Sequence, residues 1–333
     1  MQRARGVTAV ADADLVRAIE EWNVRVVSLR RRPFEYTSSA ALELITAAVA
    51  NGAERRFVLK HVGDISERAL RVKPGFVLDP YREVEVYRRL LAPLGIGPRL
   101  IGSAVGLDSG DWLLIEEIDG QPLYEARELH PWAAVARSLG AMHARFMTLD
   151  HASLQQSARL LNYDRQWYAI WLERASRFFS VEGPINSRRT TTSLRWLAER
   201  YDRVVERMLS LPNTIIHGEL YASNVLVSGG PVNPTVCAID WEMTAIGPGI
   251  VDLAALTSGH WTDADRDTLI AAYAAGCGAA AGATLAETVE LTTYAQIHLA
   301  VQWLGWFGRR GAAAAHVRDW LSDAVDRAEA LRL

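Results

Sequence analysis

Residues 214–228 read Thr-Ile-Ile-His-Gly-Glu-Leu-Tyr-Ala-Ser-Asn-Val-Leu-Val-Ser, and residues 236–242 read Val-Cys-Ala-Ile-Asp-Trp-Glu. Two short runs of β-forming residues, at 225–228 and 235–239, flank a Gly-Gly-Pro-Val-Asn-Pro turn. Runs of this kind pair as an antiparallel hairpin. The pairing predicts that Asn224, at the start of the first strand, lies beside Asp240, at the end of the second.

The side chains of Asn224 and Asp240 offer the oxygen atoms that Mg²⁺ prefers. Mg²⁺ takes one or two protein ligands and completes its octahedron with waters and phosphates. Glu219 lies on the loop before Asn224, where a carboxylate can accept the proton of an attacking hydroxyl. The segment therefore predicts a phosphoryl-transfer site in which Glu219, Asn224 and Asp240 are catalytic.

This spacing resembles the catalytic loop of protein-kinase-like enzymes, and His-Gly-acid with Ile-Asp-Trp-Glu resembles the aminoglycoside phosphotransferase and choline kinase family. The resemblance implies that Glu219 is the catalytic base, that Asn224 and Asp240 bind Mg²⁺, and that His217 braces the loop. The family usually carries Asp where this chain has Glu219. Because Glu is longer by one C–C bond, about 1.5 Å, the difference concerns the geometry of the proton acceptor.

The implied fold is α+β and bilobal, protein-kinase-like, with an antiparallel-sheet N-lobe at 1–118 and a mostly helical C-lobe at 119–333. Composition divides the chain similarly, because a helical segment at 12–22 leads into a β-rich region that ends near Glu117. After Gly120 the pattern is mostly helical apart from the hairpin. We expect helices at about 130–146, 193–209, 251–257, 264–275, 285–305 and 314–331.

Lysine is rare in this chain, because only Lys60 and Lys73 occur among 36 basic residues. Lys60 ends a strand pattern at 56–60 that is entered from an Asn-Gly turn. By resemblance, Lys60 is the lysine that pairs with the α- and β-phosphates of the nucleotide. Lys73 precedes Pro74-Gly75 in a loop and is interpreted as a solvated charge.

The segment 79–91 has apolar residues at helical spacing, with Asp79 as the expected cap and Pro80 in the first turn. It resembles the αC helix of the kinase fold. Glu83 is the better match to the acid that pairs with the lysine, and Glu85 is the alternative. Either one can also be an ordinary exposed helix acid.

Further nucleotide contacts are implied by the resemblance alone. The strand at 112–118 leads to a hinge where backbone groups of Glu116, Glu117 and Ile118 hydrogen-bond the adenine of ATP, and backbone contacts leave GTP as an alternative. Between the first two strands, expected at about 24–31 and 42–49, lies a loop without glycine. Its residues Thr37, Ser38 and Ser39 offer hydroxyls and amides to phosphate oxygens. The alternative is an ordinary hairpin loop rich in Ser and Thr, which would have the same composition.

Two acids are interpreted as supporting residues. Asp252 follows a Gly-Pro turn, as an Asp does in the family, and is expected to brace the catalytic loop through backbone hydrogen bonds. Glu242 either adds to the surroundings of Mg²⁺ or holds an arginine.

Composition limits the other classes of function. The net charge is −3 and no long basic run occurs, which argues against a nucleic-acid partner. No run of eighteen apolar residues and no signal-peptide pattern occurs, so we expect a cytoplasmic protein with no membrane partner. Cys237 and Cys277 form no disulfide framework or zinc spacing. The sequence does not indicate the oligomeric state.

The expected activity is transfer of the γ-phosphate of Mg-ATP to a hydroxyl of a small molecule, most readily an antibiotic such as an aminoglycoside or a nucleoside, for resistance or self-protection. The alternatives are a kinase of a metabolite alcohol (choline, homoserine or a sugar) and a nucleotide-binding pseudokinase scaffold.

A small acidic excess after Asp119 fits a cationic acceptor. Acids that can face it are Asp150, Asp164, Glu173, Asp263 and Asp265. An aromatic wall of Tyr163, Trp167, Tyr168 and Trp171 would suit a flatter acceptor, whereas Trp303, Trp306 and Phe307 are expected in the core.

Overall fold

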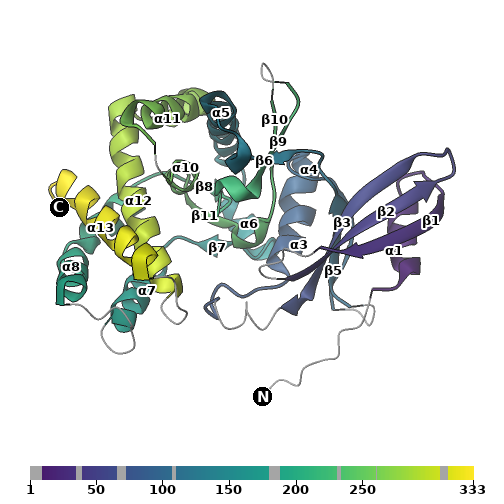
Figure 1. The fold of residues 1–333 in the computed structure, drawn as a ribbon, viewed down its shortest axis with the longest axis horizontal. Coiled ribbons are helices and arrows are strands. Elements are labelled where there is room, and N and C mark those ends of the chain that lie inside the picture. The colour runs from purple at the N-terminus through teal and green to yellow at the C-terminus, as the bar shows by residue number, and fades with distance from the viewer. Residues whose placement is uncertain are drawn as a thin grey trace. The chain divides into compact units, whose positions relative to one another are not determined.

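The computed structural model describes residues 10–34, 40–65, 73–106, 110–179, 188–230, 234–259, 261–307 and 314–333. Within it the chain forms two compact units (Figure 1). Unit 1 comprises Met1–Asp119, Gln156–Arg159 and Cys237–Glu242, and unit 2 comprises Gly120–Gln155, Leu160–Val236 and Met243–Leu333. The two short segments 156–159 and 237–242 therefore belong with the N-terminal unit, although they follow Asp119 in the sequence.

Unit 1 is built on a five-stranded antiparallel sheet with the strand order β1-β2-β3-β5-β4. The strands are β1 (Val26–Pro33), β2 (Ala40–Val49), β3 (Glu54–Ile65), β4 (Leu100–Ala104) and β5 (Trp112–Glu116). The third strand is central, and its Lys60 is paired with Leu42 on β2 and Leu113 on β5. The β4 strand was not predicted from the sequence.

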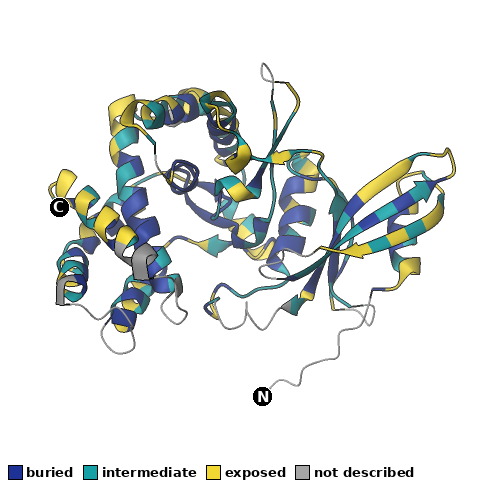
Figure 2. Ribbon diagram, viewed as in Figure 1, coloured by how far each residue is buried: buried dark blue, intermediate teal, exposed yellow. Residues whose placement is uncertain are grey.

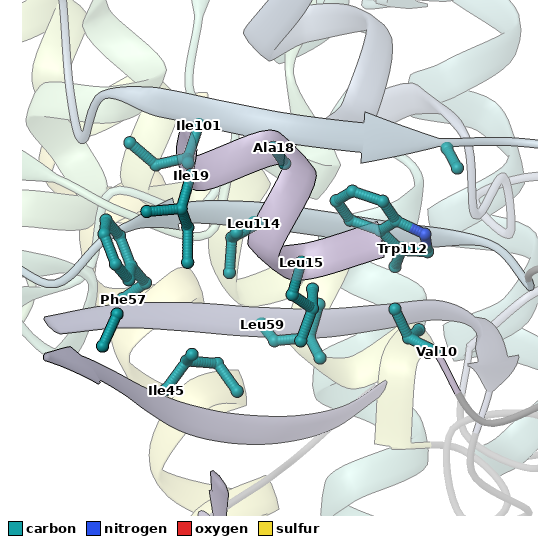
Figure 3. Close-up of a cluster of buried hydrophobic side chains, with 12 residues drawn as sticks. Val10, Leu15, Ala18, Ile19, Ile45, Phe57, Leu59, Ile101, Trp112 and Leu114 are labelled. Atoms are coloured by element: carbon teal, nitrogen blue, oxygen red, sulfur yellow. The ribbon is translucent and has the colours of Figure 1, made fainter. Parts of the chain in front are cut away.

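One face of this sheet packs against α1 (Asp12–Glu20) in an apolar cluster (Figure 3). Leu15 and Ile19 of the helix meet Phe57 and Leu59 of β3 there. Because side chains alternate along a strand, Lys60 faces the side of the sheet opposite to this cluster. At Gly102 on β4 the helix comes so near that an added Cβ would lie 2.7 Å from the Cβ of Ala18.

The αC-like segment is helical, but it begins later than the sequence predicted. It comprises α3 (Arg82–Val86), the π-helical segment η1 (Tyr87–Leu91) and α4 (Ala92–Leu94). The N-cap residue is Tyr81, so the prediction that Asp79 caps the helix is wrong. Asp79 instead accepts a hydrogen bond from the Tyr81 amide at 3.1 Å and pairs with Arg159 at 2.6 Å. No side-chain hydrogen bond among the described residues caps the start of α3.

After Gly120 the described chain is largely helical. The helices are α5 (Leu129–Phe146), α6 (His151–Ser157), α7 (Arg165–Arg177), α8 (Arg188–Ala198), α9 (Tyr201–Leu209), α10 (Ile250–Leu256), α11 (Asp263–Cys277), α12 (Leu285–Phe307) and α13 (Ala314–Ala330). The helix predicted at 193–209 is two helices, α8 and α9. Arg200 lies between them, and its guanidinium donates to the carbonyls of Trp196 and Leu333.

Two three-stranded sheets hold the loops of this part of the chain, with the orders β10-β9-β6 and β7-β11-β8. Their strands are β6 (Gln121–Pro122), β7 (Leu161–Asn162), β8 (Asn213–Ile216), β9 (Val225–Ser228), β10 (Thr235–Ala238) and β11 (Ala245–Pro248). The predicted hairpin is present, because β9 and β10 are neighbours.

Helix packing in unit 2 depends on glycine at two points of close contact. A Cβ on Gly140 of α5 would lie 2.2 Å from the carbonyl oxygen of Tyr273, and one on Gly276 of α11 would lie 2.0 Å from that of Arg137. These two glycines allow α5 and α11 to pack closely. Every residue of α10 is buried (Figure 2), so this short helix lies in the core of unit 2.

The described helices also bear on the question of membrane spans. None of them alone is long and apolar enough to cross a membrane, although the pair Asp263–Ala280 and Leu285–Trp306, bent by 110°, passes on length and composition.

Candidate active site

Lys60 is the centre of a charged cluster in unit 1. Its ammonium lies 2.5 Å from Glu83 on α3 and 2.7 Å from Asp240, which follows β10. Burial opposes the charge of Lys60, but the Asp240 and Glu83 carboxylates hold its pKa well above the usual value. Burial also raises the pKa of Glu83 to about 7, against the influence of Lys60. Lys60 therefore stays protonated at neutral pH.

Of the two acids considered on the αC-like helix, Glu83 is the one that contacts Lys60. The Glu83 side chain is 5% exposed. Glu85 faces other partners and pairs with Arg88 at 2.9 Å and with Arg89 at 3.2 Å.

Asp240 has an unusual backbone conformation, with φ of 62° in a non-glycine residue. Left-handed backbone is costly for residues other than glycine and is concentrated at functional sites. The next residue, Trp241, is fully buried and donates from Nε1 to the carbonyl of Ala238 at 3.0 Å. This hydrogen bond closes the turn that holds the Asp240 carboxylate against Lys60.

Lys73 is not the solvated charge that the sequence suggested. Its ammonium pairs with Glu242, and only 12% of its side chain is exposed. Glu242 was expected either to assist Mg²⁺ or to hold an arginine. Its carboxylate holds Lys73, and its carbonyl accepts from the guanidinium of Arg82 at 2.9 Å. The loop composition around Lys73 gave no sign of this contact, because the partner is far away in the sequence.

In unit 2 the catalytic-loop segment runs from β8 through His217 to the short 3₁₀ helix η4 (Ala222–Asn224). The carbonyl of Glu219 accepts from the amide of Tyr221 at 2.7 Å and from Nδ2 of Asn224 at 2.9 Å. The Asn224 amide donates to the carbonyl of Tyr221 at 2.8 Å. The loop is thus fixed by hydrogen bonds to its own carbonyl groups, two from backbone amides and one from the Asn224 side chain. The side chain of Glu219 is half-buried.

Asp252 of α10 holds the start of this loop. It is fully buried, and its two carboxylate oxygens accept from the amides of His217 at 2.7 Å and Gly218 at 2.9 Å. These are bonds of the kind expected of Asp252. His217 is also fully buried, and its Nδ1 lies 3.4 Å from the amide nitrogen of Glu219.

Gly218 cannot readily be any other residue. Its φ is +83°, and an added Cβ would lie 2.3 Å from the carbonyl oxygen of Met243. A side chain would therefore be strained and would also collide with backbone.

His143 and Tyr273 extend the support of the loop, and sequence reasoning did not identify them. Nε2 of His143 on α5 lies 3.2 Å from Asp252, and its Nδ1 lies 3.0 Å from the hydroxyl of Tyr273 on α11. Three helices thus contribute to one buried network behind the loop. Spacing gives no signal for such residues, because their partners are more than 100 positions away.

The predicted Mg²⁺ site depends on oxygen donors of Asp240 and Asn224. No group of three or more His, Cys, Asp or Glu side chains suited to a metal ion occurs among the residues that the structure describes. Mg²⁺ needs only one or two protein oxygens, however, and Asp240 and Asn224 supply a carboxylate and an amide oxygen. Nδ2 of Asn224 donates to the Glu219 carbonyl, and its Oδ1 lies 3.5 Å from the hydroxyl of Ser223. This oxygen is the Asn224 atom that could accept a metal ion. The donor chemistry fits Mg²⁺, and the convergence of these residues, which belong to different units, stays a prediction.

Of the other predicted nucleotide contacts, the structure describes the hinge but not the phosphate loop. Thr37, Ser38 and Ser39 lie outside the described residues. At the expected hinge, the amides of Glu116 and Glu117 donate to the carbonyls of Arg99 at 2.9 Å and Arg56 at 3.1 Å. Recognition of adenine by these residues would therefore fall to the Ile118 amide and to carbonyl groups.

The predicted aromatic wall is part of the core, so that interpretation is wrong. Its members are at most 4% exposed and pack on one another: Tyr163, Trp167, Tyr168 and Trp171. Burial of large rings in a helical core accounts for their spacing.

A different aromatic group contains Tyr221, which lies two positions after Glu219 in the sequence. The ring of Tyr221 lies 5.3 Å from that of Trp303 on α12, which stacks at 5.5 Å on Trp320 of α13. All three are half-buried. Trp303 was expected in the core, and Trp306 is half-buried as well, while the side chain of Phe307 lies outside the described residues.

The acids proposed for a cationic acceptor each have a local partner. Asp150 and Asp164 accept from the amides of Ser153 and Trp167 near helix starts. Glu173 pairs with Arg177, and Asp263 pairs with Arg266, each within its own helix. The carboxylate of Asp265 accepts a hydrogen bond from the hydroxyl of Thr262.

The family follows from a comparison with protein-family models, in which residues 46–291 match the phosphotransferase enzyme family. The chain belongs to this family. The match covers well over half of the 333 residues and includes Lys60, Glu83, the catalytic loop and Asp252. A search of curated protein sequences gives no significant match.

Solved structures of phosphotransferases and kinases share the fold. The choline kinase LicA from Streptococcus pneumoniae has a TM-score of 0.60 at 14% identity, over 96% of this chain and 99% of its own. Ethanolamine kinase from Plasmodium vivax has a TM-score of 0.58 at 14% identity, over 92% of this chain and 82% of its own. Spectinomycin phosphotransferase, solved with ADP and spectinomycin, has a TM-score of 0.54 at 15% identity, over 96% of this chain and 98% of its own. The protein-kinase-like α+β fold expected from the sequence is confirmed.

Proposed function

We propose that this protein transfers the γ-phosphate of Mg-ATP to a hydroxyl of a small molecule. The observation that carries the proposal is the contact of Lys60 with both Glu83 and Asp240. These are the three residues assigned, by resemblance, to the nucleotide phosphates and the metal. Membership of the phosphotransferase enzyme family and a related fold solved with ADP support the same reaction.

Each residue has a defined task in the proposed reaction. The Lys60 ammonium neutralises phosphate oxygens, and Glu83 keeps it oriented. Asp240 and Asn224 would hold Mg²⁺, which supplies positive charge to the phosphate oxygens when bound. Glu219 accepts the proton of the acceptor hydroxyl while that oxygen bonds to the γ-phosphorus. The bond from the γ-phosphorus to the bridging oxygen breaks, and ADP leaves with the electron pair.

The orientation of the loop supports Glu219 in this task. The Glu219 backbone carbonyl is fixed by two hydrogen bonds, and Asp252 fixes the two amides before it. A rigid backbone limits the error in the position of the carboxylate, and small errors at this point are costly in rate.

For the acceptor we propose an antibiotic hydroxyl as the first candidate, as in the fold relative solved with spectinomycin. A small metabolite alcohol is the second candidate, and the half-buried rings of Tyr221, Trp303 and Trp320 favour it. Aromatic faces attract quaternary ammonium groups as well as flat rings. The local roles of the five acids considered above give little support to a polycationic acceptor.

The test is ATP consumption with mass detection of a product heavier by one phosphoryl group. The acceptor panel contains aminoglycosides, nucleosides, macrolides, spectinomycin, choline, ethanolamine, homoserine and simple sugars, with GTP as a second donor. A product that disappears in Asp240→Ala supports the proposal and identifies the acceptor class. Nucleotide binding without turnover across the panel would favour the pseudokinase scaffold and contradict the enzyme.

A further inference from the structure

The two lysines of this chain line the same pocket of unit 1. The pocket is bounded by Lys60 and Val62 of β3, Glu83 of α3, and Lys73 with Glu242. All other basic residues among the 36 in the chain are arginines. The only two lysine ammonium groups therefore share one pocket, and only one of them, that of Lys60, has a task in the reaction proposed above.

Lys73 is held at this pocket by its neighbours. Its ammonium pairs with the Glu242 carboxylate, and the side chains of the pair are 12% and 19% exposed. Pro74, the next residue, is buried, and its carbonyl accepts from the amide of Val77 at 3.0 Å. This turn fixes the backbone immediately after Lys73.

Arg82 joins that turn to the segment that carries Asp240. Its side chain is buried, and its Nη1 donates to the carbonyl of Val77 at 3.1 Å and to that of Glu242 at 2.9 Å. One guanidinium thus holds the backbone on both sides of the Lys73–Glu242 pair. Lys73 therefore has a defined place beside Glu242.

Charge balance indicates what the second ammonium is for. Lys60 is already matched by Glu83 and Asp240, and Glu242 also stabilises its charge. A nucleoside triphosphate brings several further negative charges to this place. Stabilising them requires further positive charge within reach of the phosphate oxygens.

We propose that Lys73 is a second phosphate-binding residue, which Glu242 holds in place until Mg-ATP binds and its ammonium moves to the β- and γ-phosphates. The inference rests on the proposed function, because it concerns the nucleotide of that reaction. The ammonium sits on a flexible stem and can change partners by rotation. Glu242 is then released two positions from Asp240, next to the predicted metal.

The choice of lysine in an arginine-rich chain agrees with this role. A compact ammonium acts as a point charge that can approach phosphate oxygens from several directions. A guanidinium would suit a permanent bidentate pair with Glu242 better. An ion pair with only a structural role gives no reason to depart from the arginine used elsewhere in the chain.

The experiment measures the Kd of Mg-ATP, Mg-ADP and AMP by calorimetry for the wild type and for Lys73→Gln. We expect the Kd of Mg-ATP to rise about tenfold to a hundredfold, which is the effect of losing one charged hydrogen bond. The Kd of Mg-ADP should rise less, and the Kd of AMP should not change. Arg89→Gln is the matched control. It removes one exposed cation that pairs with Glu85 in the same unit and should leave the three Kd values unchanged.

Lys73→Gln also leaves the Glu242 carboxylate without its lysine partner, and a second comparison removes this effect. Glu242→Gln is compared with the double variant Lys73→Gln/Glu242→Gln, so that neither protein contains the Glu242 charge. The same graded loss of affinity from AMP to ATP supports the inference. Equal losses for all three nucleotides, or no loss, would overturn it and leave Lys73 as a structural residue.

These results are distinguishable from failure of the proposed function. If the wild type binds none of the three nucleotides, both the function and the role of Lys73 are wrong. If the wild type binds ATP and the Lys73 variants bind it equally well, only the role of Lys73 is wrong.

Discussion

Lys60 and Asp240 are 180 positions apart in the sequence, yet their side chains form an ion pair of 2.7 Å. The pair joins the central strand of the sheet to a residue whose backbone is held at a φ of 62°. Such a conformation persists only where surrounding contacts enforce it, and here the ion pair and the buried Trp241 do so. The ion pair and the turn therefore fix the position of the carboxylate that we predict to bind Mg²⁺.

Replacement of Lys60 should affect stability as well as activity. Lys60→Met leaves Glu83 buried without its cation, and removal of one partner of a buried pair costs about 3–5 kcal/mol of unfolding free energy. Adding Glu83→Gln should restore most of this stability but no phosphotransfer. Urea unfolding and the rate of product formation measure the two effects separately. An active double variant would show that the ammonium is not needed for the reaction.

The length of the side chain at position 219 is open to a direct test. Glu219→Gln keeps the shape and removes the basic oxygen, so phosphotransfer should fall about 10²–10⁴-fold, the range for loss of a general base. Glu219→Asp withdraws the carboxylate by about 1.5 Å and should lower kcat while the KM of ATP is unchanged. Because the side chain is half-exposed, melting temperatures should stay near that of the wild type. A fully active Glu219→Gln would exclude this residue as the base.

Local patterns were sufficient to predict the hairpin and the position of Lys60. The β9–β10 hairpin follows from two short apolar runs and a Gly-Pro turn, and the end of the 56–60 run places Lys60 on a strand. Both depend on side-chain alternation and turn chemistry within a few residues. The fold could therefore be predicted from the sequence together with the family resemblance.

The partners of buried polar residues could not be predicted in this way. Lys73 in its loop and His143 on its helix show ordinary local patterns, and their contacts with Glu242 and Asp252 exist only in the folded chain. The same limit applies to Tyr163 and Trp167, because a helical aromatic stripe does not reveal whether it faces solvent or core. The rarity of lysine was the one sequence signal that could have identified Lys73.

Asp252 should matter for the shape of the catalytic loop. Asp252→Asn replaces one accepting oxygen by an NH₂ group, so the amide of either His217 or Gly218 loses its acceptor. A buried amide without an acceptor costs about 1–3 kcal/mol, and we expect a loss of stability of this size with phosphotransfer at least about tenfold slower. Urea unfolding and kcat measure both, and the Kd of ATP should change little. An equal loss of ATP affinity would contradict a role confined to the loop.

His298 gives the clearest expectation for pH dependence. It is fully buried on α12, and its Nδ1 lies 2.7 Å from the hydroxyl of Tyr201. Burial lowers the pKa of His298 from 6.5 to about 3. The folded state therefore keeps the ring neutral, whereas the unfolded chain takes up a proton below about pH 6.5. The stability that this group contributes is fully present above that pH and is lost as the pH falls toward 3.

The expected effect is a flatter stability profile when the histidine is removed. Within this window one buried histidine costs about 1.4 kcal/mol per pH unit, so the wild type should lose about 2 kcal/mol between pH 7 and pH 5 through His298. In His298→Asn, which retains a polar partner for Tyr201, this part of the loss should vanish when urea unfolding is measured at both pH values. His130→Asn removes an exposed histidine and should follow the wild type. If His298→Asn loses stability with acid as steeply as His130→Asn does, the buried ring is not what makes the fold sensitive to acid.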